Sequence, residues 1–315
     1  MIQVESLTKK YKDKVAVDGL TFTVRPGMVT GFLGPNGAGK STTMRMIVGL
    51  DAPTSGTVTV GGRRYAEHAR PLQEVGVLLE ARAIHPGRSA RSHLFGLAAT
   101  AGIGRRRVEE VIGLVGLGEV AGRRAGAFSL GMGQRLGLAS ALLGDPEILI
   151  LDEPVNGLDP DGVRWIRTLL TDLAAEGRTV FLSSHLMSEM ALTADHVIVL
   201  GRGRLLRDEP MAALIASASP NIVRVRSPQA RQLAGLLMAD AVTVNNLDEH
   251  TLEVDGYDIE HIGGVASAAG ITLFELTAQV ASLEEAYMEL TADSVEYRST
   301  DEYDAHSNLL GKAAA

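Results

Sequence analysis

The chain has 315 residues, no cysteine and a formal net charge of −8 at pH 7. Its length allows two domains with a sizeable core, and the lack of cysteine excludes disulfides and thiol chemistry. The negative charge argues against nucleic acid as the main partner. No apolar run approaches the roughly 18 residues of a membrane-spanning helix. Residues 1–4 lead straight into a strand pattern, so we expect no signal peptide.

The first 65 residues contain short segments in which apolar and polar residues alternate. These segments are residues 15–17, 20–24 and 56–60. Alternation favours half-buried strands, so we predict an antiparallel layer that flanks the next strand.

A strand, a glycine-rich loop and a helix are predicted in succession between residues 28 and 50. Met28–Leu33 is an apolar run, residues 42–50 have helical spacing, and the loop between them matches the phosphate-binding pattern G-x-x-x-x-G-K-[ST]. Lys40 would reach the β- and γ-phosphates, and the Ser41 hydroxyl would hold Mg²⁺. A chance glycine-rich turn is the alternative, and the flanking elements argue against it. The expected nucleotide-binding residues are Gly34, Pro35, Asn36, Gly37, Ala38, Gly39, Lys40, Ser41 and Thr42.

Strand and helix patterns then alternate up to residue 144. Residues 75–79 predict a strand that leads into Glu80. Residues 87–125 are helical in pattern, with a break at residues 102–104, and residues 131–143 predict a further helix.

Two adjacent acids follow a second buried strand. Ile148–Leu151 is fully apolar, which is typical of a parallel strand buried on both faces, and Asp152 and Glu153 come directly after it. Ligands of parallel sheets collect at the carboxyl ends of the strands. We therefore predict that Asp152 holds Mg²⁺ and that Glu153 polarises the attacking water. Two solvated acids that cap a core strand are the alternative.

Three later motifs resemble those of ABC ATPases. Residues 128–135, Phe-Ser-Leu-Gly-Met-Gly-Gln-Arg, resemble the Leu-Ser-Gly-Gly-Gln-x-Gln-Arg signature, and residues 156–159, Asn-Gly-Leu-Asp, resemble the D-loop. Residues 183–185, Ser-Ser-His, follow a predicted strand and resemble the switch-histidine loop. Tyr11 stands where the family has the aromatic residue that stacks on adenine. The resemblance covers about residues 1–215.

The chain after residue 158 predicts three further features. Asp159 and Pro160 open a helix, since proline favours a first turn, and residues 195–200 and 203–206 predict a closing hairpin. After residues 217–220 a second unit follows the order βαββαβ of a ferredoxin-like fold. Its strands are predicted at residues 222–226, 242–244, 251–254 and 271–276, and its helices at residues 228–238 and 258–269.

The last predicted helix spans residues 282–290 and begins with a capping box of Ser282 and Glu285. From Asp293 on the chain is polar and acidic without periodicity, so we expect disorder. Residues 221–290 carry no catalytic motif, and their expected role is dimer contact or stabilisation. A regulatory ligand site is the alternative for this unit.

The resemblance implies an α/β fold with the P-loop NTPase domain of ABC type. This domain would span residues 1–217 with a helical subdomain at about 87–144, followed by a small α+β domain at 218–292 and a tail at 293–315. ATP and Mg²⁺ would be the cofactors, with Glu153, His185 and Lys40 in catalysis. Ser129 and Gly131 would contact the γ-phosphate held by a second copy of the chain, beside the D-loop residue Asp159.

Residues 85–88 and 128–135 resemble the drug- and antibiotic-export branch of the family. The resemblance implies the ATP-hydrolysing subunit of an export transporter that carries a drug, an antibiotic or a lipid-like compound. It also implies a homodimer around two ATP molecules that drives a separate membrane permease. Such a subunit is cytoplasmic and lies on the inner face of the cell membrane.

The sequence departs from the family pattern at three positions. Leu130 and Met132 replace the first glycine and the glutamine of the signature, and Glu80 stands at the Q-loop glutamine. Glu80 could ligate Mg²⁺, although its charge opposes the γ-phosphate; a surface glutamate at a strand end is the alternative.

Two other functions stay open. One is a degenerate regulatory nucleotide-binding module, against which the intact Lys40, Asp152, Glu153 and His185 argue. The other is a soluble ABC-family ATPase without a membrane partner, a class that commonly carries duplicated cassettes, long coiled coils or basic surfaces. This chain has one P-loop and no sustained heptads.

Overall fold

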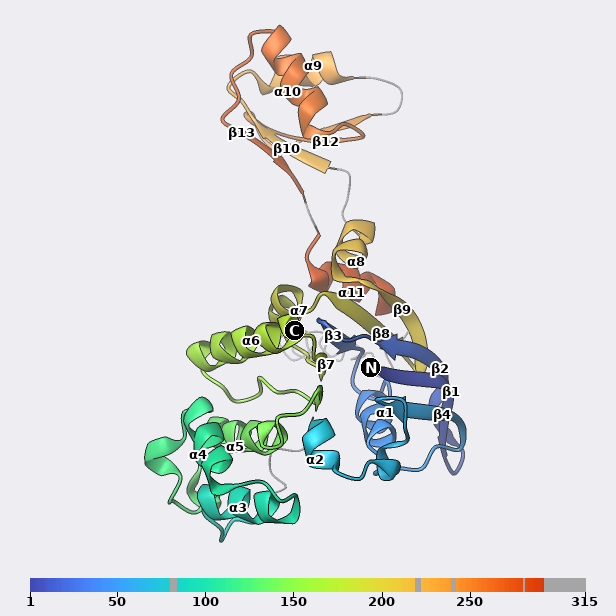
Figure 1. The fold of residues 1–315 in the computed structure, drawn as a ribbon. Helices are drawn as coiled ribbons and strands as arrows, with labels where there is room; N and C mark the ends of the chain where they lie inside the picture. Colours follow the sequence, from blue (N-terminus) through green and yellow to red (C-terminus); the bar gives the residue numbers. More distant parts are fainter. Residues whose placement is uncertain (80–83, 219–221, 239–241, 280, 292–315) are drawn as a thin grey trace, which may run out of the picture. The chain divides into compact units, whose positions relative to one another are not determined.

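A computed structural model describes residues 1–79, 84–218, 222–238, 242–279 and 281–291 (Figure 1). Contacts between Cα atoms divide the chain into two compact units, formed mainly by Met1–Pro210 and by Met211–Glu289. Among the described residues, no helix is both long enough and apolar enough to cross a bilayer. Glu80 and the tail from residue 293 lie outside the described residues, so both remain expectations from the sequence.

The first unit is organised around a six-stranded sheet with the strand order β5-β6-β7-β3-β8-β9. Strands β5 to β8 in this order are parallel, and β9 pairs antiparallel with β8, which confirms the predicted closing hairpin. All residues of β6 and β7 are buried, because helices or the second layer cover both faces. The strands are β5 (Val75–Leu78), β6 (Ile148–Leu151), β7 (Thr179–Ser183), β3 (Met28–Leu33), β8 (His196–Gly201) and β9 (Arg204–Pro210).

A second, antiparallel sheet covers one side of the first, as predicted from the alternating segments. It contains β1 (Ile2–Tyr11), β2 (Lys14–Val24) and β4 (Ser55–Val60), in the order β2-β1-β4. Phe22 of this layer packs on Phe32 and Phe181 of the central sheet, with ring centroids 5.7 and 6.1 Å away. Helix α1 (Lys40–Ile47) contributes Met44 and Ile47 to the same core.

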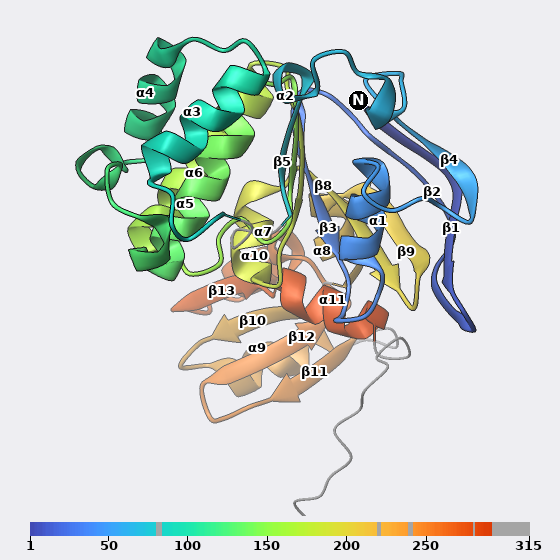
Figure 2. The ribbon, with the colours of Figure 1, turned by 90° about the horizontal axis from the view of Figure 1, so that it is seen from below.

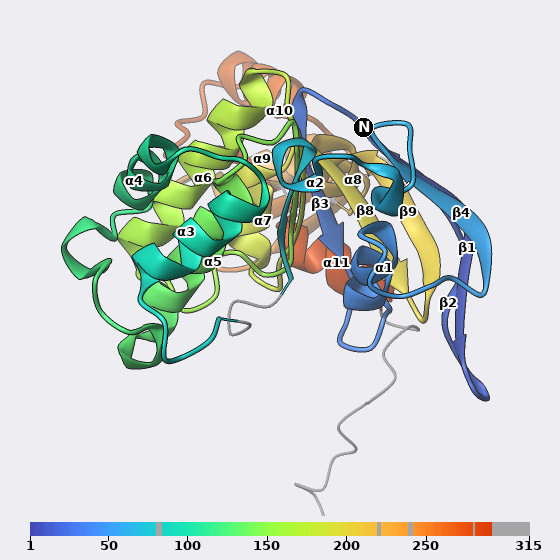
Figure 3. The same cartoon turned by 60° about the horizontal axis from the view of Figure 1, so that its bottom comes forward.

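Most helices of the first unit lie on the other side of the central sheet (Figures 2 and 3). Residues 102–104 separate two of them, as predicted, and Gly102 has the positive φ of +66° that this turn requires. The helices are α2 (Pro71–Glu74), α3 (Ala90–Thr100), α4 (Arg105–Leu114), α5 (Leu130–Leu142), α6 (Pro160–Ala175) and α7 (Met187–Thr193). Short 3₁₀ turns occur at Tyr65–Glu67, Gly118–Val120 and Ala125–Ala127.

The second unit has the predicted βαββαβ order, and its sheet is fully antiparallel with the order β11-β12-β10-β13. Inward-facing residues of β10 and β12, such as Val225 and Leu252, form a core with Leu233 and Ile262 of the two helices. The elements are α8 (Met211–Ala218), β10 (Ile222–Arg226), α9 (Ala230–Leu237), β11 (Thr243–Asn246), β12 (Thr251–Asp255), α10 (Ile259–Ala268), β13 (Glu275–Ala278) and α11 (Leu283–Thr291). The predicted capping box of α11 is present, since Glu285 N–H donates to Ser282 Oγ and Ser282 N–H to Glu285 Oε2.

One predicted strand of this unit was misplaced. The apolar residues at 271–276 predicted a strand there, but β13 begins at Glu275. Ile271 instead closes the end of α10, because its N–H donates to the carbonyl oxygen of Ala266 at 2.9 Å. Gly270, with φ +67°, donates to Ser267 in the same turn. These two bonds form the Schellman motif that ends many helices, so Ile271 is buried as part of a cap.

Glycine is required at one buried position of the central sheet. A Cβ on Gly76 in β5 would collide with the carbonyl oxygen of Ala141 in α5, whereas a Cβ on Gly96 in α3 would meet open space. We expect Gly76→Ala to destabilise the first unit by about 1–3 kcal/mol through overpacking. The control Gly96→Ala should stabilise it by about 0.5–1 kcal/mol, since alanine is the better helix former. Urea unfolding followed by the fluorescence of Trp165 compares the two; a Gly76→Ala midpoint at or above that of Gly96→Ala contradicts the clash.

Candidate functional site

The glycine-rich loop between β3 and α1 forms one wall of a groove of about 280 Å³. Gly39 is the N-cap of α1 with φ +100°, and a Cβ on it would lie 2.6 Å from the carbonyl oxygen of Ala16. Gly37 also has a positive φ, of +83°. These conformations require glycine and bring bare backbone close to whatever occupies the groove. Residues 35–42 of the loop line the groove together with Ala16, Asp152 and Glu153.

Lys40 is the cation of this groove. Its ammonium donates to the carbonyl oxygens of Gly34 and Pro35, the second at 3.3 Å. Burial lowers the pKa of Lys40, while the charges of Glu153 and Asp152 act in the opposite direction. A partly desolvated ammonium held at a helix N-terminus is suited to bind phosphate.

Asp152 joins two hydroxyl groups from different elements. Ser41 Oγ donates to its Oδ2 at 2.8 Å, and Ser183 Oγ at the end of β7 donates to its Oδ1. Ser183 Oγ in turn accepts the backbone N–H of Glu153 at 3.0 Å. The hydroxyl of Ser41 and the carboxylate of Asp152 are hard oxygen donors, the type that Mg²⁺ takes together with waters and substrate phosphates. No cluster of three or more His, Cys, Asp or Glu side chains that could hold a metal ion occurs in the described part of the chain.

Glu153 has an unusual backbone and a defined partner. Its φ is +51°, a conformation that non-glycine residues adopt rarely and that gathers at functional sites. Its Oε2 accepts hydrogen bonds from His185 Nδ1 at 2.8 Å and from the His185 backbone N–H at 3.3 Å. The side chains of Glu153 and His185, which lie far apart in the sequence, are therefore brought into contact.

The signature segment and the D-loop contact each other. Ser129 caps α5 by accepting from Met132 N–H at 3.2 Å, and Asp159 caps α6 by accepting from Gly162 N–H at 2.9 Å. A Cβ on Gly131 would lie 2.6 Å from the carbonyl oxygen of Gly157. Leu130 packs on Gly157 and is 51% exposed. Ser129, Gly131 and Asp159 are not among the described residues that line the groove at Lys40.

Tyr11 ends β1 and lies beside the start of α1, where its hydroxyl interacts with Thr42. This hydroxyl also donates to Asp51 Oδ2 at 3.2 Å, and Asp51 binds Arg45 at 2.8 Å. The ring is 47% exposed, with the ammonium of Lys9 at 4.9 Å from its centroid. Burial, and secondly the hydrogen bond to Asp51, raise the pKa of Tyr11.

Two residues to which the sequence patterns gave no individual role lie next to Glu153. One is Ser183, described above, and the other is Gln134, whose Nε2 donates to the carbonyl oxygen of Glu153 at 3.0 Å. Gln134 is 3% exposed in spite of its polar side chain. Gln134 belongs to the signature motif and Ser183 to the switch-histidine motif. This membership could have singled out the two residues, although it does not predict the contacts that they make.

Comparisons with known proteins agree with this geometry. The family model described as ABC transporter matches residues 17–156, and a domain of unknown function, DUF8746, matches residues 221–284. An uncharacterized ABC transporter ATP-binding protein of Bacillus subtilis, YhcH, is 35% identical over 311 residues, 94% of this chain and 97% of that protein. The bacitracin transport ATP-binding protein BcrA of Bacillus licheniformis is 37% identical over 303 residues, 92% of this chain and 97% of that protein.

A solved structure is also similar. It is a dimeric, post-hydrolysis state of an ATP-binding cassette bound to ADP and Pi, with a TM-score of 0.62 and 25% identity over 67% of this chain and 99% of that chain. These similarities explain the presence of the phosphate loop. They also explain the two carboxylates after β6 and the order of the motifs along the chain. The chain belongs to the ABC transporter family, as an ATP-binding and ATP-hydrolysing subunit with the ABC ATPase fold.

Proposed function

We propose that the chain hydrolyses ATP to drive a separate membrane permease in an export transporter. The observation that carries this proposal is the cluster at the carboxyl ends of β3, β6 and β7. There Lys40 and Ser41 lie close to Asp152 and Glu153, and Glu153 contacts His185. This combination of a phosphate-binding cation, hard oxygen donors and a positioned carboxylate fits hydrolysis of a nucleoside triphosphate.

In this proposal different residues of the groove bind the phosphates, hold the metal ion and activate the water. Residues 34–42 bind the phosphates, and Lys40 exchanges its carbonyl partners for β- and γ-phosphate oxygens. Ser41 and Asp152 hold Mg²⁺, which when bound offsets the negative charge of the phosphates. Glu153 orients the attacking water and accepts its proton, and His185 keeps the carboxylate in place through Nδ1.

We further propose that two copies of the chain enclose two ATP molecules. Ser129 and Gly131 do not line the groove of their own chain, so a second copy would bring them to the γ-phosphate. ATP then binds the closed dimer more tightly than separate chains, and hydrolysis removes that preference. The mutual contact of Gly131 and Gly157 would place Asp159 at the same interface.

The helical part of the first unit offers a surface for the permease. We propose that a cytoplasmic segment of the permease binds the helical part and holds the chain at the inner face of the membrane. Its binding surface excludes the cavity of about 360 Å³ lined by Ser129 and Leu130, because that face is assigned to the second copy of the chain. The exported molecule would be a drug, an antibiotic or a lipid-like compound, since relatives are named for bacitracin transport, lantibiotic transport and Nod factor export.

The signature segment of this chain carries a half-exposed Leu130 where the family has a glycine. A steady-state ATPase assay of the purified chain at saturating ATP and Mg²⁺ tests hydrolysis with this altered signature, and a lack of phosphate release would contradict the proposal.

Lys40→Ala should weaken ATP binding and abolish hydrolysis, because it removes the fixed cation of the phosphate loop. Binding of a fluorescent ATP analogue and release of phosphate are the measurements. Lys10→Ala is the matched control, since Lys10 is an exposed lysine of β1 outside the groove. Near-parent hydrolysis by Lys40→Ala would refute the assignment.

Tyr11→Ala should lower the affinity for ATP modestly and leave kcat unchanged, because stacking stabilises the ground state and the transition state equally. Tyr11→Phe should retain most of the affinity, since it loses the bond to Asp51 but keeps the ring. Steady-state kinetics measure both variants. A fall in kcat at constant KM, or equal effects of the two substitutions, would contradict stacking.

Glu153→Gln should retain ATP and lose turnover. Glutamine keeps the shape of the side chain but cannot accept the proton, so kcat should fall by about 10²–10⁴-fold, roughly 3–5 kcal/mol of barrier. His185→Ala should also lower kcat, because it removes the partner that holds this carboxylate. The control Glu147→Gln changes an exposed glutamate just before β6 and should behave like the parent.

The Glu153→Gln variant also tests the proposed dimer. Light scattering after size exclusion, with and without ATP–Mg²⁺, should find Glu153→Gln dimeric in ATP, because unhydrolysed nucleotide holds the copies together. A monomer at saturating ATP means that the dimer requires the permease or that Leu130 and Met132 weaken it. Normal hydrolysis by Glu153→Gln would show that another group is the catalytic base.

A further inference from the structure

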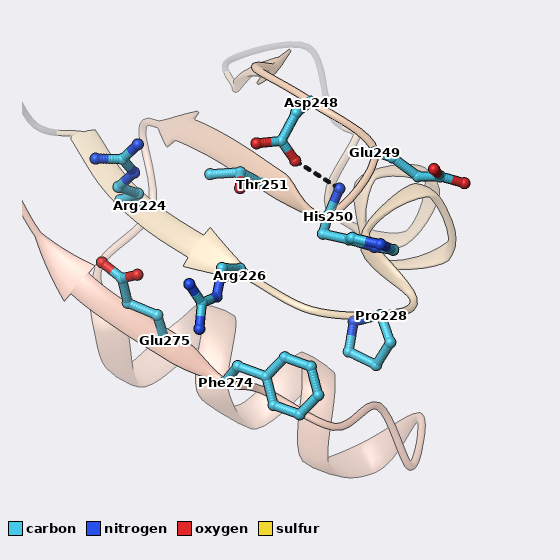
Figure 4. A pocket seen from close by; sticks show the side chains of 9 residues that line it. All are labelled: Arg224, Arg226, Pro228, Asp248, Glu249, His250, Thr251, Phe274 and Glu275. Carbon is cyan, nitrogen blue, oxygen red and sulfur yellow. Dashed lines mark hydrogen bonds between the residues drawn. The ribbon is translucent and has the colours of Figure 1, made fainter.

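The second unit contains a larger cavity than the phosphate groove, with a volume of about 780 Å³. It lies on the sheet face formed by the outward-pointing residues of β10, since the alternate residues Val223 and Val225 are buried against α9 and α10 (Figure 4). This volume is in the range of sites that take small organic ligands. Its lining residues are Arg224, Arg226, Pro228, Asp248, Glu249, His250, Thr251, Phe274 and Glu275.

Two guanidinium groups are available on this face. Arg224 and Arg226 are both exposed and occupy successive outward positions of β10. Glu275 lies opposite Arg226 in the strand register, yet within the described part of the chain neither arginine has an ion pair or a side-chain hydrogen bond. Two neighbouring guanidinium groups with free donors can bind a carboxylate in the bidentate geometry that arginine favours.

Negative charges lie at the other edges of the same cavity. Glu249 and Glu275 have no hydrogen-bond or ion-pair partner for their side chains among the described residues. Asp248 accepts the His250 backbone N–H at 2.7 Å, which shapes the turn between β11 and β12 and lowers the pKa of Asp248. The three carboxylates of the lining, together with Glu253 opposite Arg224 in β12, therefore surround two guanidinium groups. A polyanion such as nucleic acid would meet these carboxylates and be repelled, whereas a ligand with charges of both signs can satisfy both sets.

The cavity also has an apolar wall. Phe274 is 62% exposed and lies beside Pro228 and Arg226 (Figure 4). Its position is fixed by its backbone N–H, which donates to the carbonyl oxygen of Arg226 at 2.7 Å. An exposed phenylalanine next to two free arginines is typical of a recognition surface, since aromatic residues and arginine dominate such sites.

We propose that this face of the second unit binds a short peptide with a free carboxylate, a cationic group and an apolar side chain. The carboxylate binds Arg224 and Arg226, the cationic group lies near Glu249 or Glu275, and the apolar side chain packs on Phe274 and Pro228. Recognition uses side chains, because the backbone groups of β10 are already paired with β12 and β13. The proposal is independent of ATP hydrolysis in the first unit.

The probe is the tripeptide Ala-Phe-Ala with free termini, titrated into the full chain by calorimetry and by saturation-transfer NMR. Its C-terminal amide should bind at least about tenfold more weakly, and its N-acetyl form several-fold more weakly, because each removes one charge. The double variant Arg224→Gln/Arg226→Gln should show the same loss for the parent peptide. Arg231→Gln, on an exposed arginine of α9 outside the cavity, is the matched control and should bind as the parent does.

The apolar contact has its own pair of variants. Phe274→Ala should weaken binding, whereas Leu236→Ala, which removes a similarly exposed apolar side chain from α9, should not. Unchanged chemical-shift dispersion of the amide NMR signals of residues 222–279 shows that the second unit of each variant is folded. The proposal is overturned if Ala-Phe-Ala gives no saturable binding up to about 10 mM, or if the amide and the double variant bind as well as the parent. Arginine-dependent binding of a 20-residue oligouridine in place of the peptide would assign the face to nucleic acid.

Discussion

The geometry of the groove at the glycine-rich loop depends on the hydrogen bonds that the carboxylate of Asp152 accepts. Strands β6, β7 and β3 are neighbours in the central sheet, so their carboxyl ends meet at one edge. Asp152 follows β6 and accepts the hydroxyl of Ser183 at the end of β7 and that of Ser41 after β3. One side chain therefore fixes the phosphate loop relative to the strand that precedes His185. Because β6 and β7 are fully buried, this arrangement rests on a rigid support.

Much of the first unit could be predicted because its sequence signals are local. The strands at Met28–Leu33 and Ile148–Leu151 were predicted with the bounds that the structure has, since continuous apolar runs mark strands buried on both faces. The phosphate loop at residues 34–41 is equally local, because its glycines, lysine and serine follow one another within a single short segment. The contacts of Ser183 and Gln134 with Asp152 and Glu153 could not be predicted from residue patterns, because each joins residues 19 or more positions apart.

The second unit shows where local signals fail. Its βαββαβ order and the capping box of α11 follow from patterns within a few residues. The start of β13 does not, because Ile271 satisfies the same apolar pattern by closing α10. The cavity on this sheet was not predictable either. Arg224 and Arg226 look like ordinary solvated charges in sequence, and their availability depends on which cross-strand residues pair with them.

Helix α5 contacts the loop of residues 153–157 at two points within one chain. Gln134 of α5 donates to the carbonyl oxygen of Glu153 at 3.0 Å, and Gly131 at the start of the same helix rests on Gly157. Glu153 and Gly157 are separated by a few residues of one loop, and Glu153 already has a strained φ of +51°. A displacement of the start of α5 must therefore shift the D-loop, reorient Glu153 or break the bond from Gln134. Contacts made at Ser129 and Leu130 by another chain can in this way affect the position of Glu153.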